Sequence, residues 1–134
     1  MRSRRFVLLL ATLVFGASDL VHKSLDRAEF HHARAPLFTI VMTVVIVALV
    51  VLVPRVPSNA AAVGAGIACG GALGNLVSLL AWSQGVPDPL VFGGETRGVA
   101  FNLADVFALT GDGLLLSAVA VYGVRNRRAL REPV

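Results

Sequence analysis

Four long apolar runs dominate the sequence and leave few folds open to it. They cover residues 6–21, 36–53, 60–82 and 101–124. A helix that crosses the hydrocarbon core of a bilayer needs about 20 predominantly apolar residues, and only helices and closed barrels satisfy their backbone hydrogen bonds there. The runs therefore predict an all-α membrane protein whose single domain, residues 1–134, has four transmembrane helices.

The first run also has the pattern of a cleaved secretory leader. Arg2, Arg4 and Arg5 precede its apolar stretch, and small residues at positions 16–18 would suit a cleavage site. Asp19 and Lys23 follow directly. Because both belong to the candidate site derived below, we favour a retained helix.

The composition argues against a soluble domain and against a nucleic-acid-binding domain. Hydrophobic residues make up 56% of the chain and charged residues 15%, and the mean hydropathy is +0.77. The net charge is +4, but the basic residues lie at the margins of the apolar runs, as in membrane topology signals. The single cysteine, Cys69, provides neither a disulfide nor a Cys-based metal site within one chain.

The distribution of basic residues predicts the orientation. With four spans, both termini lie on the same side as the loop between the second and third helices. That side holds eight basic residues: Arg2, Arg4, Arg5, Arg55, Arg125, Arg127, Arg128 and Arg131. The other side holds four: Lys23, Arg27, Arg34 and Arg97. Cytoplasmic loops carry the excess of Lys and Arg, so both termini are expected in the cytoplasm.

Polar residues gather at the opposite, extracytoplasmic ends of the runs. They are Asp19, Lys23, Asn75, Asp88, Asn102 and Asp105. Ionisable groups in a span are costly, so they suggest a functional site. Simpler roles stay open: Asp19 and Lys23, spaced i, i+4, could neutralise each other, and Asn102 and Asp105 could cap a helix.

Two carboxylates near one membrane surface suggest aspartyl chemistry. Two close carboxyls share one proton, so that one acts as base toward water and the other as acid toward a scissile carbonyl. Asp112 lies seven residues after Asp105, on the same helical face. We expect it to be a buried, protonated carboxyl bonded to a neighbouring helix, although a proton or cation path through Asp105 and Asp112 is an alternative.

Two motifs resemble blocks of signal peptidase II, the lipoprotein signal peptidase: GGALGNL at residues 70–76 and FNLAD at residues 101–105. The resemblance covers most of the chain and is dense from residue 70 to residue 111. It implies a four-helix bacterial inner-membrane aspartyl protease that removes signal peptides from diacylglyceryl-modified prolipoproteins. The implied partners are that lipid-modified signal peptide and membrane lipid, with no cofactor, metal or nucleic acid.

The resemblance also implies roles for single residues. Asp88 and Asp105 match the two catalytic aspartates. Asn75 and Asn102 match asparagines that would orient the dyad or the peptide, and Asp19 with Lys23 matches the Asp-x-x-x-Lys of the first helix.

The chain departs from the family in several places, among them the shorter Gly-to-Asp spacing before Asp88 and the prolines on either side of it. The family's arginine four residues after the asparagine of the glycine-rich block is here Leu79; Glu95 and Arg97 could replace its charge. The family's extracytoplasmic segment between the first two helices is shortened to residues 22–35, so the substrate-clamping part is expected to be reduced or lost. We expect Asp26, Glu29, His31 and His32 there to form a solvated polar loop rather than a metal site.

Two alternative functions stay open. The chain could be a catalytically inactive protein that binds lipidated peptides, or it could be a small transporter subunit.

Overall fold

Each apolar run forms one long helix in the computed structural model, which describes residues 1–33, 35–93 and 98–127. Within these residues the helices are α1 (Arg2–Leu25), α2 (Pro36–Leu52), α3 (Asn59–Ala81) and α4 (Leu103–Arg125), with a short 3-10 turn, η1 (Val53–Arg55), after α2. All four are long and apolar enough to cross a membrane. The expectation of a mostly helical chain with four candidate spans is confirmed.

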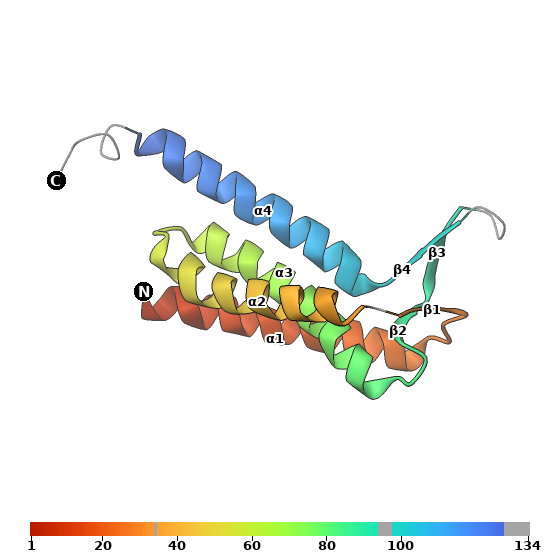
Figure 1. Cartoon of the computed structure of the whole chain (residues 1–134). Helices are drawn as coiled ribbons and strands as arrows, with labels where there is room; N and C mark the ends of the chain where they lie inside the picture. The colour runs from red at the N-terminus through yellow and green to blue at the C-terminus, as the bar shows by residue number, and fades with distance from the viewer. Residues whose placement is uncertain (34, 94–97, 128–134) are drawn as a thin grey trace.

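The central element is α3, against which α1 and α4 pack on different sides (Figure 1). Glycines permit this close approach: a Cβ on Gly66 would clash with the backbone of Leu8 in α1, and a Cβ on Gly71 would clash with the backbone of Ala104 in α4. Gly111 of α4 makes the reciprocal contact with Ala68 of α3. Small residues at such positions are the usual basis of tight helix packing in membranes.

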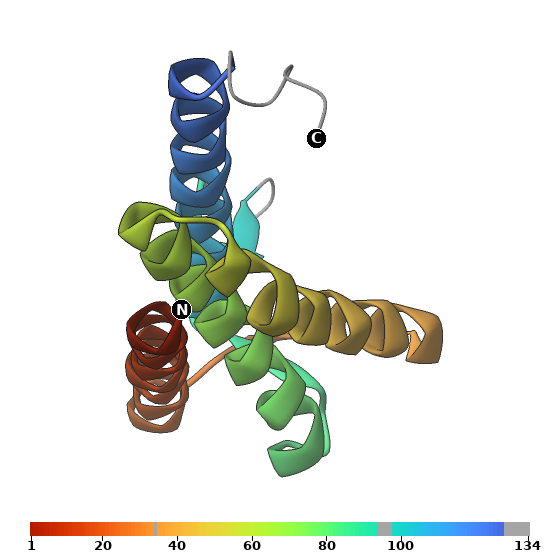
Figure 2. The same cartoon turned by 90° about the vertical axis from the view of Figure 1, so that its left-hand side faces the viewer.

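The second helix, α2, is held mainly by its C-terminal end and diverges from the other three toward its N-terminal end (Figure 2). None of its residues is buried. Most of the Val, Ile and Leu side chains of this helix are exposed, among them Leu37, Ile40 and Val44. A helix that is apolar all round and contacts protein mainly at one end is suited to contact with lipid along the rest of its length.

Two short antiparallel ribbons lie at the end of the bundle away from the N-terminus and η1 (Figure 1). In the described part of the chain, β1 (Phe30–His32) pairs with β2 (Val86–Asp88), and β3 (Leu90–Phe92) pairs with β4 (Val99–Phe101). The segment between α1 and α2 thus holds one three-residue strand, β1. Because residues 99–101 join β4, α4 begins at Leu103 instead of 101.

Two expectations from the sequence are wrong. Asp112 is exposed and borders an apolar groove between α2 and the α3–α4 pair, because α2 diverges and leaves that face of α4 open. His32 lies in strand β1 rather than in a loop and contacts Asp88, while its side chain stays 60% exposed as expected. Five residues used in the sequence argument lie outside the described residues: Arg34, Glu95, Arg97, Arg128 and Arg131.

Candidate active site

A cluster of buried polar side chains lies where the ribbons meet the helix ends. Five of the six residues singled out in the sequence are at most 5% exposed: Asp19, Lys23, Asn75, Asp88 and Asn102. The sixth, Asp105, is half-buried. Buried polar groups need hydrogen-bond partners, and the contacts of this cluster supply them to one another.

Lys23 joins α1 to α3. Its Nζ donates to Asp19 Oδ2 at 2.7 Å, to Asn75 Oδ1 at 2.8 Å and to Ser78 Oγ at 3.2 Å. An ammonium has three protons to donate, and all three have acceptors here. Ser78, which the sequence analysis missed, is a polar residue three positions after Asn75 in an apolar run, and that spacing puts both on one face of α3.

Asp19 extends the same network to α4. Its Oδ1 accepts the backbone N–H of Ala104 at 2.8 Å, in the first turn of α4, where helix N–H groups have no partner within the helix. Gly74 leaves the space for this carboxylate, since a Cβ there would clash with it. Asp19 therefore does more than neutralise Lys23: it ties three helices together.

Asn75 connects Lys23 to Asp105 through one hydrogen bond to each. Because its Oδ1 accepts from Lys23, its amide nitrogen must point the other way, and Nδ2 donates to Asp105 Oδ1 at 3.2 Å. This contact fixes one oxygen of Asp105 against α3.

Asn102 connects the two aspartates. It is the N-cap of α4 in a capping box: its Oδ1 accepts the N–H of Asp105, and its own N–H donates to Asp105 Oδ2, both at 3.2 Å. The other end of the side chain donates through Nδ2 to Asp88 Oδ1 at 2.6 Å and to the carbonyl of Pro87 at 3.3 Å. The capping role expected as the simpler alternative is present, and the same residue donates to both carboxylates, through its backbone N–H to Asp105 and through its side chain to Asp88.

The β1–β2 ribbon encloses Asp88, which is 1% exposed. Its second oxygen, Oδ2, contacts Nδ1 of His32. Sequence reasoning could not find this pair, since the two residues are 56 positions apart and meet only through strand pairing.

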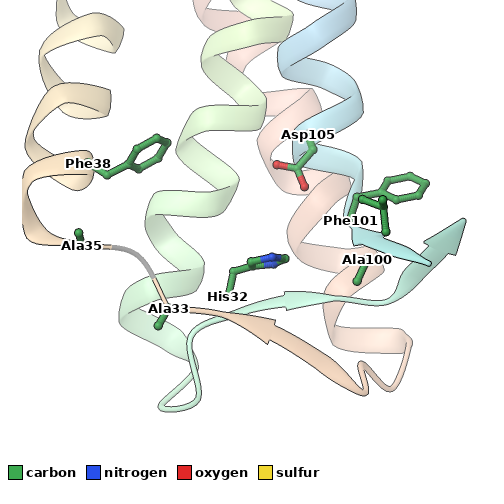
Figure 3. Close-up of a pocket in the computed structure, with 8 residues that line it drawn as sticks. His32, Ala33, Ala35, Phe38, Ala100, Phe101 and Asp105 are labelled. Carbon is green, nitrogen blue, oxygen red and sulfur yellow. The ribbon is translucent and has the colours of Figure 1, made fainter. Parts of the chain in front are cut away.

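A cavity of about 620 Å³ opens beside this cluster. It is lined by His32, Ala33, Ala35, Phe38, Val99, Ala100, Phe101 and Asp105. In Figure 3, Asp105 projects into it from α4, His32 lies across from Asp105 above the ribbon, and Phe38 of α2 bounds another side. The cavity thus combines an apolar wall with two groups that can exchange protons.

Comparison with models of protein families gives a match. A family model described as signal peptidase (SPase) II matches residues 11–121, which include every residue of the cluster. A search of curated proteins found no significant match.

Proposed function

The chain belongs to the signal peptidase II family, and on this premise we propose that it is a membrane-embedded aspartyl endopeptidase that removes signal peptides from diacylglyceryl-modified prolipoproteins. The observation that carries the proposal is Asn102, which donates to the carboxylate of Asp88 through its side chain and to that of Asp105 through its backbone N–H, while Asp105 lines a cavity. The site residues are then Asp88 and Asp105, which are catalytic, and Asn75, Asn102, Asp19 and Lys23, which position them.

The chemistry follows from two carboxyls in different surroundings. Asp88 accepts two contacts and supplies the negative charge needed to remove a proton from water. Asp105 borders the cavity and, when protonated, hydrogen-bonds the scissile carbonyl. No cofactor enters this scheme.

We propose further that the four helices form one domain in the bacterial inner membrane, with both termini cytoplasmic. The arginines at the start of α1, in η1 and at the end of α4 all lie at the end of the bundle opposite the ribbons (Figure 1). The positive-inside rule places that end in the cytoplasm and the site near the outer surface. The divergence of α2 leaves the cavity bounded by Phe38 and Ala35 on the lipid side, which suits a substrate that arrives from the bilayer.

The test is cleavage by the purified wild-type protein in lipid. The substrate is a diacylglyceryl-modified prolipoprotein, and the matched control is the same precursor with serine in place of its lipid-bearing cysteine. We expect cleavage of the lipid-modified precursor alone. Binding of that precursor without cleavage would establish the inactive, peptide-binding alternative, which Leu79 in place of the family's arginine favours.

A transporter that uses Asp105 and Asp112 as a proton path is separated from the protease by one substitution. We expect Asp112→Asn to retain cleavage within about threefold, because seven residues of helix place it about 10 Å from Asp105 along the axis. The measurement is the initial cleavage rate of the lipid-modified precursor. A transporter that moves protons through Asp112 would instead lose transport when this carboxyl is replaced.

A further inference from the structure

Asp112 is a carboxyl group that the proposed chemistry does not use. It lies near the middle of α4 (Leu103–Arg125) and is exposed. Among the described residues, none forms a hydrogen bond or an ion pair with it. An ionisable group at this depth of a membrane span is costly unless it faces a polar partner. Its position therefore points to a contact with another molecule that reaches this depth.

The groove beside Asp112 has a volume of about 220 Å³ and lies between α2 and the α3–α4 pair. It extends along α2 from Phe38 to Leu49, which corresponds to about 16 Å of helix. Cys69 and Ala72 of α3 line it on the side opposite α2. All of its other lining side chains are apolar, so Asp112 provides its charged group. The divergence of α2 from α4 leaves it open toward lipid (Figure 2).

The groove continues from the cavity of the candidate active site. Phe38 lines both of them, and Figure 3 shows its side chain beside the cavity that Asp105 borders. From Phe38 the groove follows α2 toward η1, which is the cytoplasmic end in the proposed orientation. A signal peptide has a basic start that stays in the cytoplasm and a cleavage site at the far end of its apolar segment. The residues before the scissile bond therefore run in the same direction as the groove.

We propose that this groove receives one face of the apolar segment of the signal peptide, and that Asp112 selects precursors with a Ser or Thr hydroxyl beside it. This inference rests on the proposed protease function and adds a substrate preference to the same site. Asp112 does not touch the reacting atoms; it determines specificity through a hydrogen bond made about 10 Å away from them.

The chemistry of the partner follows from the carboxyl and from the membrane. A carboxyl oxygen accepts hydrogen bonds in either protonation state, so the partner must be a donor. A lysine or arginine in the middle of an apolar segment is costly to insert into a bilayer. Ser and Thr hydroxyls, in contrast, are common in such segments and hydrogen-bond across helices.

The position of the hydroxyl follows from the spacing of Asp105 and Asp112. Seven residues of α4 separate them by about 10 Å along the helix axis. The same distance takes about seven residues of a helical signal peptide or about three residues of an extended one. The hydroxyl should therefore lie between about three and seven residues before the scissile bond.

The size of the groove limits what enters it. A helix with side chains is about 10 Å wide, so a groove of about 220 Å³ takes the side chains of one face and not a whole helix. An acyl chain of the substrate or of a membrane lipid is the other occupant of suitable shape. It has no hydrogen-bond donor, so an acyl chain would make cleavage indifferent to a serine in the peptide.

The test is a series of lipid-modified precursors whose signal peptide has a leucine segment with one serine, moved one position at a time through positions 3 to 10 before the scissile bond. Hydrogen bonds between membrane helices are worth about 3- to 20-fold. For the wild type we therefore expect kcat/KM to reach a maximum at one position between 3 and 7, about 3- to 20-fold above the all-leucine precursor.

Asp112→Leu is expected to remove this maximum while cleaving the all-leucine precursor within about threefold of the wild-type rate. Asp112→Asn keeps an acceptor oxygen and should retain the maximum. The matched control is Thr110→Val, which removes a polar, exposed side chain of α4 that lies outside the groove and bonds to its own helix at Val106. It should retain the maximum as well.

Retention of the same precursors by Asp105→Asn, in which the proposed acid is absent, is measured in parallel. The serine that favours cleavage should also favour retention, and the further change Asp112→Leu should abolish that preference. A wild type that never cleaves would remove the proposed function, but the retention measurement would still decide the role of Asp112.

Two results overturn the inference while leaving the protease function intact. One is equal cleavage and equal retention at every serine position, which would assign the groove to an acyl chain. The other is a maximum that survives in Asp112→Leu, because the hydroxyl would then be recognised elsewhere.

Discussion

Replacement of Asp105 by asparagine is expected to lower the cleavage rate by about 10³- to 10⁴-fold, and replacement of Asp88 by asparagine by a similar factor. General acid–base groups contribute on this order, and groups that act as a unit lose most of their effect when either is removed. Asparagine keeps the size of the side chain and one acceptor oxygen, but it cannot exchange a proton. The measurement is the initial rate on the lipid-modified precursor, with melting temperature as a check of folding.

The two variants are expected to lose cleavage activity for different reasons. Asp105→Asn keeps an oxygen for Asn75 or for the backbone N–H of Asn102, so the start of α4 is preserved while the acid is lost. Asp88→Asn keeps a partner for Asn102 but loses the negative charge opposite His32. A matched control is Asp26→Asn, which removes one negative charge at the same end of the bundle from a carboxylate that is 56% exposed. The control should cleave like the wild type.

Cleavage by Asp105→Asn within about tenfold of the wild-type rate contradicts the dyad. An equal loss of cleavage in Asp26→Asn also contradicts the dyad, because the effect would then follow from net charge rather than from these two carboxyls.

The helices were predictable because their signal is local. Each run is apolar over its own length, and no distant contact is needed to make a helix of it in an apolar solvent. Their ends were less predictable: α1 extends to Leu25 because Lys23 and Asp19 are satisfied by α3 and α4, which the apolar run alone cannot reveal. The ribbons were missed, since three-residue strands are too short to show an alternating pattern.

The site was predictable only as far as the depth of its polar residues in the membrane identifies it. Polar residues in four separate segments were expected near one surface, and the structure brings them into contact through Lys23, Asn75 and Asn102. The pairing of His32 with Asp88 depends on strand register across 56 residues, which no local pattern encodes. Asp112 was misjudged because the sequence does not reveal that α2 diverges from α4.

Lys23→Met is the substitution expected to destabilise the fold most. Lys23 and Asp19 side chains are both fully buried, and their N–O distance is 2.7 Å. Removal of one partner from a buried ion pair leaves an uncompensated charge and costs about 3–5 kcal/mol. Lys23→Met also deprives Asn75 of the donor that orients it toward Asp105, so cleavage should fall together with stability. The measurement is the free energy of unfolding in mixed detergent.

The double variant Asp19→Asn with Lys23→Met distinguishes a lost charge balance from lost packing. It removes both charges, while the asparagine oxygen can still accept the N–H of Ala104. Replacement of a whole buried pair is much less costly than breaking it, so the double variant should be more stable than Lys23→Met alone. Arg27→Met, which removes an exposed cation four residues further along, just past the end of α1, should change stability by less than about 0.5 kcal/mol. Equal destabilisation in the single and double variants would mean that the methylene stem of Lys23, and not its charge, holds α1 against α3.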